Sequence, residues 1–291
     1  MLEADLERRW EERVEDERIR EAVEARRFHL YYQPVVSVAG GEVVGVEALL
    51  RLNSDVGRVR SEIFLPLLDS GQLWGEVGLW VLERACREAL PWAADELWLT
   101  VNVAAQQLDA GYAAGVLKTL EATGFPPELL CLELTTTAGL RDPILAWTEL
   151  RILKSRGVGL LIDDFGTAGS SIADLVSFRL DAVKIAPDFV AGLGRDPEAD
   201  AIVAALVGLA HALDMQAIAE GVETTRQLDR LKALGCDLAQ GFHLQRPGDA
   251  GTITRFIAGT GHRSDVGSAH HGGTPQDTMG LTSERGAAAS P

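Results

Sequence analysis

Hydrophobic residues between about positions 28 and 260 fall into short apolar runs, separated by stretches with helical spacing. The first two runs, Leu30–Val36 and Val43–Leu50, consist mainly of residues that favour strands, and Ala39-Gly40-Gly41 between them is typical of a tight turn. A connection this short cannot make a parallel crossover. We therefore expect the two runs to form an antiparallel hairpin.

Further apolar runs follow the hairpin, each with room for a helix before the next, as βα units require. They are Leu97–Val103, Leu130–Thr135, Gly159–Ile162, Ala182–Ile185, Gln216–Ala219 and Cys236–Ala239, and a helix is expected over Glu76–Leu90. Together with the hairpin they predict an α/β fold, a modified (β/α)₈ TIM-type barrel with one antiparallel strand. An open doubly wound sheet is the alternative, although no GxGxxG motif follows an early strand.

The two ends of the chain differ in composition from the predicted barrel domain, which covers residues 28–260. Residues 1–27 are dense in Glu and Arg and carry a weak apolar stripe, which predicts a charged N-terminal helix on the surface. The alternative for this segment is a helix that dimerises or relays a signal. Residues 261–291 are rich in Gly, Ser, Ala, Thr and His without periodicity, which predicts a disordered tail.

Composition and charge narrow the class of protein. The chain of 291 residues is 46% hydrophobic and has a formal net charge of −16, which argues against a DNA-binding or RNA-binding protein. The three cysteines form no CxxC pair, as expected of free thiols in a reducing compartment. The N-terminus has no apolar signal-peptide core, and Ile202–Leu213 is too short to span a bilayer. We therefore expect a cytoplasmic protein without membrane insertion.

Polar residues occur in almost every predicted strand or at its C-terminal end. In a barrel these side chains converge on the face that carries barrel active sites. The set is Gln33, Glu47, Asn102, Glu133, Asp163, Asp164, Lys184, Glu220 and Gln240. Buried carboxylates are costly unless they are paired or bind a metal ion, and one lysine cannot balance five acids.

The types of these residues point to a hard metal ion. Oxygen ligands without His or Cys suit Mg²⁺ or Mn²⁺ rather than Zn²⁺. In the adjacent pair Asp163 and Asp164 we expect one side chain to turn inward and its neighbour elsewhere, which suits a two-metal phosphoester site. Two structural alternatives remain open: Asp163-Asp164-Phe165-Gly166 only turns the chain, and Glu47 pairs with Arg51.

Several motifs resemble those of the EAL domain family, the bacterial cyclic di-GMP phosphodiesterases and receptors. They span about residues 28–258 in the family's order: YYQP at 31–34, GVEALLRL with Glu47-Ala48-Leu49, VNVAAQQL at 101–108, DDFGT at 163–167, VKI at 183–185, AEGVET at 219–224 and LAQGF at 238–242. The family fold is a modified (β/α)₈ barrel with an antiparallel strand, as the hairpin also predicts.

The resemblance implies a metal site. Glu47, Asn102, Glu133 and Asp163 match the principal metal ligands of the family, and Asp164 matches the ligand of a second ion. The implied cofactor is Mg²⁺ or Mn²⁺ in a two-metal site.

The resemblance also implies the remaining roles. Lys184 and Glu220 match residues that position the hydrolytic water, and with Glu47 they are the implied catalytic residues. Gln33, Arg51 and Gln240 match contacts to the dinucleotide or supports of the metal site. The implied reaction is hydrolysis of one phosphodiester bond of cyclic di-GMP to linear pGpG, and the implied assembly is a homodimer formed through barrel helices.

The chain departs from the family pattern around the expected ligands. Thr136 stands where the family usually has the glutamate that anchors the loop after DDFG, the loop at 166–171 lacks its tyrosine, and Ala186 replaces an aspartate. Such losses commonly reduce metal affinity or activity about 10–100-fold. The expected function is therefore a weakened phosphodiesterase, and the alternative is a receptor that binds cyclic di-GMP without turnover.

Overall fold

Two long strands, β1 (Phe28–Ser37) and β2 (Val43–Ser54), form the antiparallel hairpin that the sequence predicts, with Gln33 opposite Glu47. The structure is a computed structural model that describes residues 17–54, 57–60, 64–65, 68, 73–134, 140, 142–166 and 180–260. Residues 17–24 are helical and precede the hairpin. The hairpin begins a sheet whose first and last strands meet.

Strand β1 closes this sheet into a barrel. It pairs antiparallel with β2 on one side and with β9 on the other, whereas the pairs from β2 and β4 round to β8 and β9 are parallel. The other strands are β3 (Gly57–Arg60), β4 (Trp98–Val103), β5 (Leu130–Leu134), β6 (Gly159–Phe165), β7 (Ala182–Ile185), β8 (Gln216–Ala219) and β9 (Leu238–Ala239). Strand β3 only extends β2, so the ring has eight strands. The predicted TIM-type barrel with one antiparallel strand is confirmed.

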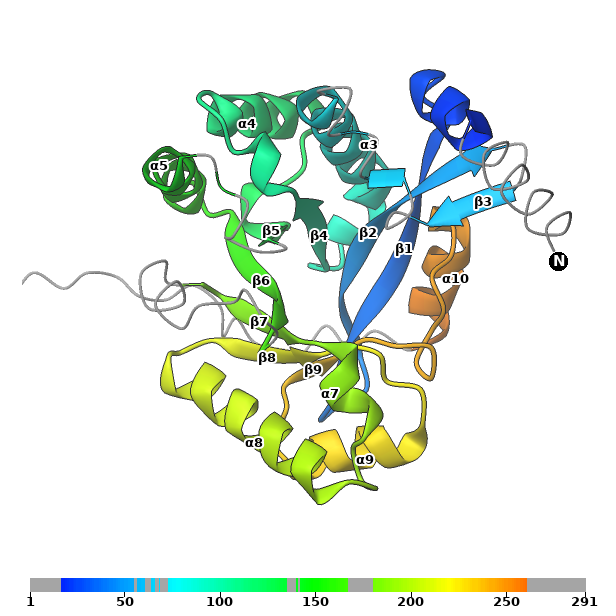
Figure 1. Ribbon diagram of the computed structural model, residues 1–291, viewed down its shortest axis with the longest axis vertical. Helices are drawn as coiled ribbons and strands as arrows, with labels where there is room; N and C mark the ends of the chain where they lie inside the picture. Colours follow the sequence, from blue (N-terminus) through cyan, green and yellow to red (C-terminus); the bar gives the residue numbers. More distant parts are fainter. Residues whose placement is uncertain are drawn as a thin grey trace, which may run out of the picture.

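Helices cover the outside of the barrel, as Figure 1 shows, with α3, α4 and α5 on one side and α8 and α9 on the other. They are α3 (Trp74–Ala93), α4 (Tyr112–Thr123), α5 (Pro143–Lys154), α7 (Pro187–Ala191), α8 (Pro197–Ala212), α9 (Thr225–Ala233) and α10 (Ala250–Gly259), with 3₁₀ turns at Ala105–Gln107 and Pro127–Leu129. Their apolar faces and the outward side chains of the strands form the main core. Among the described helices, none is long and apolar enough to cross a membrane.

The inside of the barrel has an apolar layer beneath a polar one. The apolar layer takes one residue from each of six strands: Val35, Cys131, Leu161, Ala182, Ile218 and Leu238. Side chains two positions apart on a strand share a face, so Cys131 on β5 predicts that Glu133 also faces inward. Strand β1 runs the other way, and its polar residue Gln33 therefore lies two positions before Val35 rather than after it. The fold places the polar layer at the carboxyl ends of the parallel strands.

Several strand limits differ from those that the sequence predicts. Strand β6 runs on to Phe165, and β9 begins at Leu238 because the Cys236 N–H donates to the Leu231 carbonyl at the end of α9. The short strand β3 was not predicted. Residues 1–16, the predicted tail 261–291, Thr136 and the loop from residue 167 lie outside the described residues.

Candidate active site

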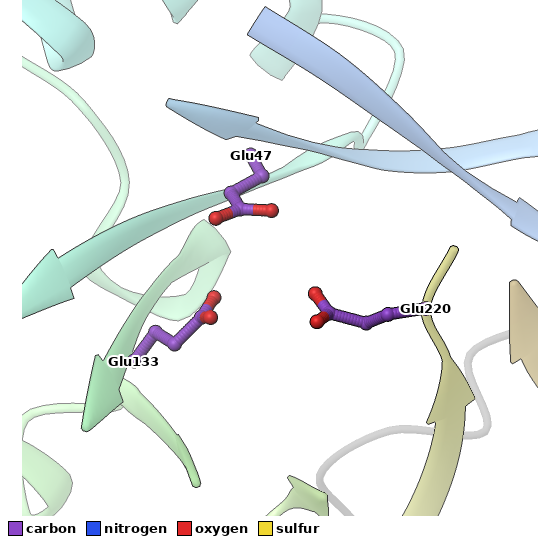
Figure 2. A group of neighbouring side chains, drawn as sticks. All are labelled: Glu47, Glu133 and Glu220. Atoms are coloured by element: carbon purple, nitrogen blue, oxygen red, sulfur yellow. The ribbon is translucent and has the colours of Figure 1, made fainter. Parts of the chain in front are cut away.

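Three glutamates converge at the carboxyl end of the barrel. Glu47 lies on β2, Glu133 on β5, and Glu220 directly follows β8. Figure 2 shows their carboxylates pointing toward one another, and each offers an oxygen within 4.8 Å of the others. Glu133 is 0% exposed and Glu47 is 5% exposed, so this is a buried cluster of negative charge.

Lys184 on β7 lies at the centre of the cluster. Its Nζ is 2.9 Å from Glu47 Oε2, 2.7 Å from Glu133 Oε1 and 2.9 Å from Glu220 Oε1. The side chain is 1% exposed. One buried ammonium therefore binds three carboxylates from three different strands.

Glu47 also accepts hydrogen bonds from two side-chain amides. Asn102 Nδ2 donates to Glu47 Oε1 at 2.8 Å, and Gln240 Nε2 donates to Glu47 Oε2 at 2.7 Å. Gln240 Nε2 also donates to Gln33 Oε1 at 3.0 Å, and Gln33 in turn donates to the Gln245 carbonyl at 2.9 Å. These bonds join β2 and β4 to β1 and the segment after β9.

A glycine next to Gln240 lets this last segment approach the site. The Val222 N–H donates to the Gln240 carbonyl at 3.1 Å, and the His243 N–H donates to the Val222 carbonyl at 2.9 Å. A Cβ at Gly241 would collide with the backbone of Val222. Only glycine allows the two chain segments to run this close together.

Burial and like charges shift the titration of the cluster. Burial, followed by the charge of Glu47, raises the pKa of Glu133 well above its ordinary value, and burial raises the pKa of Glu220 to about 7. Burial also acts on Glu47, but Lys184 and the hydrogen bonds from Gln240 and Asn102 outweigh it and lower its pKa. Burial opposes the charge of Lys184, but the three glutamates hold its pKa well above the ordinary value. The cluster carries more negative charge than one lysine balances.

Asp163 and Asp164 form a second acidic group that shares Glu220. Each of the three offers an oxygen within 4.8 Å of the other two. The pairing of β6 with β7 is irregular between Ile162 and Phe165, and Asp164 has a φ of 51°. The Asp164 N–H donates to Asp163 Oδ1 at 2.7 Å. In a regular strand two adjacent side chains would face opposite sides, and the bulge instead brings both carboxylates near Glu220.

The two acidic groups fit divalent cations. All their donor atoms are carboxylate oxygens, the ligands preferred by Mg²⁺ and Mn²⁺. Glu133 Oε2 and Gln240 Oε1 are buried acceptors without a hydrogen-bond partner. Buried acceptors without partners are rare in proteins, and a cation would satisfy them. Because Glu220 belongs to both groups, the arrangement suits two neighbouring ions.

The structure brings most of the sequence-predicted site residues together and leaves one at the margin. Arg51 is half-buried further along β2, where its Nη1 donates to the Leu50 carbonyl at 2.8 Å. Four residues along a strand span about 13 Å, so Arg51 is not the partner that holds Glu47. Sequence reasoning missed Gln245, since it takes part through its backbone carbonyl and no side-chain pattern marks it.

Comparison with known proteins gives one family and several relatives. The family model for the EAL domain matches residues 16–247. The bifunctional diguanylate cyclase/cyclic di-GMP phosphodiesterase MucR of Pseudomonas aeruginosa is 38% identical over 247 residues, which are 82% of this chain and 36% of MucR. The chain spans about a third of the length of the curated relatives it matches.

The fold also resembles those of solved structures. The MucR phosphodiesterase in complex with cyclic di-GMP has a TM-score of 0.74 and 38% identity, covering 80% of this chain and 97% of that one. Klebsiella pneumoniae BlrP1 in a complex with manganese and cyclic di-GMP has a TM-score of 0.67 and 27% identity, covering 76% of this chain and 56% of that one.

Proposed function

The chain belongs to the EAL domain family, and from that premise we propose that it hydrolyses cyclic di-GMP with the help of Mg²⁺ or Mn²⁺. Water adds to one phosphodiester phosphorus, the bond from that phosphorus to a ribose 3′ oxygen breaks, and linear pGpG results. The relatives named for this activity and the solved complexes with cyclic di-GMP support the proposal.

Four of the acidic residues, together with Asn102, are proposed to hold the cations. Glu47, Asn102, Glu133 and Asp163 would bind the first ion and Asp164 the second. Bound divalent cations would offset the negative charge of the carboxylates and of the phosphodiester as charge develops on it.

The other residues are proposed to act on the water and on the dinucleotide. Lys184 and Glu220, whose side chains meet at 2.9 Å, would position the hydrolytic water. Gln33 on β1, Gln240 directly after β9 and Arg51 on β2 would contact the dinucleotide.

One observation carries the proposal: three glutamates converge on a single buried lysine, with a buried carboxylate oxygen left without a partner. Burying this much like charge costs several kcal/mol per ion and contributes little to stability. A cluster of this kind is therefore expected at a ligand site and not in a barrel interior that only supports the fold. The intact set of expected carboxylate ligands favours turnover over the alternative of a cyclic di-GMP receptor.

The test is incubation of the purified chain with cyclic di-GMP and Mn²⁺ or Mg²⁺, followed by chromatography of the products. We expect pGpG from the unmodified chain and at least about a hundredfold less from Glu47→Gln. Glu149→Gln is the matched control, because Glu149 is a buried glutamate that accepts backbone N–H bonds at the start of α4, outside the site. Tight binding of cyclic di-GMP without formation of pGpG would reject the phosphodiesterase hypothesis and favour the receptor hypothesis.

We further propose that Thr136 weakens the activity. The family's usual glutamate at this position anchors the loop after DDFG, and threonine has no carboxylate to do so. Thr136→Glu should therefore raise the turnover rate or the Mn²⁺ affinity by about tenfold or more. The same chromatographic assay and a Mn²⁺ titration measure both, and no change in either would show that the loop is held in another way.

A further inference from the structure

The ammonium of Lys184 is shared by three carboxylates. An ammonium carries three N–H donors and no acceptor. Three carboxylates lie at hydrogen-bond distance from its Nζ, one each from Glu47, Glu133 and Glu220. Two of the three donors are used in hydrogen bonds to Glu47 and Glu133, and the third contact is the ion pair with Glu220.

The same three carboxylates form the first acidic group. Glu47, Glu133 and Glu220 are one of the two sets of described residues whose oxygens lie close enough to hold a single cation. Glu47 and Glu133 are also proposed ligands of the first ion, so the ammonium and a divalent cation compete for the same carboxylates. Two positive groups this close together in a buried site repel each other strongly.

From this geometry we propose that Lys184 is the resident counter-cation of the metal-free site, and that a divalent cation displaces it from at least one glutamate. This inference rests on the cation binding proposed above and adds two consequences. Lys184 keeps the cation affinity below what the carboxylates alone would give. Its release from a glutamate would free an N–H donor for water or phosphate.

The burial of the site makes the competition strong. Lys184 and Glu133 side chains are each 1% exposed, so little solvent screens the charges. Without its lysine, the metal-free cluster would hold buried carboxylates with no cation at all, which is strongly destabilising. Lys184 thus stabilises the metal-free site and lowers its affinity for a divalent cation.

Lys184→Met tests the proposal, because methionine keeps the length of the side chain and removes its charge. Metal-free protein is titrated with Mn²⁺ in a calorimeter, with no cyclic di-GMP present. We expect Lys184→Met to unfold at a lower temperature than the unmodified chain when metal-free, and to bind Mn²⁺ at least about tenfold more tightly. Equal or weaker Mn²⁺ binding by Lys184→Met would overturn the proposal.

Lys154→Met is the matched control. Lys154 Nζ pairs with Asp181 at 2.7 Å, and Asp181 lies just before β7, at the opposite end of the barrel from the site. Removing this lysine should leave the Mn²⁺ dissociation constant unchanged. An equal rise in Mn²⁺ affinity in Lys154→Met would show that the effect comes from net charge, and it would overturn the proposal.

A second measurement needs no variant, which matters where Lys184→Met does not fold. Crystal structures of the unmodified chain with and without Mn²⁺ should differ at Lys184, with at least one of the three contacts beyond hydrogen-bond distance in the Mn²⁺ form. All three contacts kept beside a bound Mn²⁺ would overturn the proposal. Because neither experiment uses cyclic di-GMP, a chain that fails to hydrolyse it can still confirm or contradict the role of Lys184.

Discussion

At the scale of single residues, the backbone of Asp164 adopts a left-handed conformation, with a φ of 51°, that most residue types avoid. This conformation costs a typical L-residue about 1–2 kcal/mol, and Asp and Asn tolerate it best because their side chains bond locally. The bulge needs it, since the turn at Asp164 brings the carboxylates of Asp163 and Asp164 to the same side of β6. Asp164 therefore combines the carboxylate of a proposed metal ligand with a residue type that tolerates this backbone conformation.

We expect Asp164→Ala to be about 1 kcal/mol less stable than Asp164→Asn. Both variants lose the same charge, so the difference between them reports the left-handed conformation together with the local bonds by which Asn stabilises it. Urea unfolding of the metal-free proteins measures it. Equal unfolding midpoints would show that the left-handed turn at this position costs alanine nothing.

The residues of the site show what a sequence can and cannot predict about a centre of this kind. That Glu47, Glu133 and Lys184 face one space follows from strand alternation and from the convergence of barrel strands. The contact of one ammonium with three carboxylates cannot be predicted in this way, because it depends on the tilt and stagger of the strands. The bulge at Asp163 was also beyond the sequence pattern, from which one side chain was expected to turn inward and its neighbour elsewhere, whereas both carboxylates lie near Glu220.

At the scale of elements, Thr224 caps the N-terminus of helix α9 and lies shortly after Glu220 in the sequence. Thr224 Oγ1 accepts the Gln227 N–H at 3.3 Å, and Gln227 Oε1 accepts the N–H of Thr224 at 2.9 Å, which together form a capping box. Gln227 is buried, and its Nε2 also donates to the Val190 carbonyl at the end of α7 at 3.1 Å. The last residue of the AEGVET motif thus serves the helix that follows β8.

Thr224→Ala should lower the free energy of unfolding by about 1 kcal/mol, because the helix loses its N-cap. Mn²⁺ affinity should stay the same, since Thr224 contacts no acid of the site. Thr225→Ala, one position along and exposed, is the control: it removes only a 3.4 Å contact with His243 and should change both quantities little. Chemical denaturation and a Mn²⁺ titration separate the outcomes, and a loss of Mn²⁺ binding in Thr224→Ala would contradict a purely capping role.

Elements with a continuous apolar pattern were predicted best. The limits of β7 and β8 are those that the sequence indicates, because both strands are apolar runs that are buried on both faces of a parallel sheet. Helix α3 was found, but it runs from Trp74 to Ala93 and includes Pro91 in its last turn. Strand β3 has four residues, too few for an alternating pattern to be recognised.

At the scale of the whole molecule, the three cysteines lie in different layers and are all buried. Cys86 is on α3, Cys131 is in the apolar layer of the barrel, and Cys236 lies just before β9. Burial raises the pKa of Cys86 and of Cys236 to about 12, and it also raises the pKa of Cys131. Since the thiolate is the reactive form, all three should be inert in the folded protein.

An aromatic disulfide reagent at neutral pH should label almost no thiol in native buffer and three per chain in denaturant. A raised thiol pKa leaves a smaller thiolate fraction at every pH below it, so a modest rise in pH should not restore labelling while the fold persists. Absorbance of the released thiolate counts the labelled residues. Rapid labelling of one thiol in native buffer would reveal a local opening around that cysteine.

The antiparallel strand β1 makes the barrel close between its earliest and latest strands, and this has a consequence for folding kinetics. Glu47 and Gln240 touch at 2.7 Å although they are 193 positions apart in sequence. The entropy of closing so long a loop disfavours this contact until most other strands have paired. We therefore expect the cation site to form after the transition state for folding.

A ligand of a late-forming site slows unfolding and leaves the folding rate nearly unchanged. In stopped-flow experiments, Mn²⁺ should lower the unfolding rate of this chain, while the refolding rate stays within about twofold. A Mn²⁺-dependent refolding rate would show instead that the pairing of β1 with β2 and β9 is part of the folding nucleus. If the refolding rate is unchanged, the pairing of the antiparallel strand β1 determines when, during folding, the proposed cation site forms.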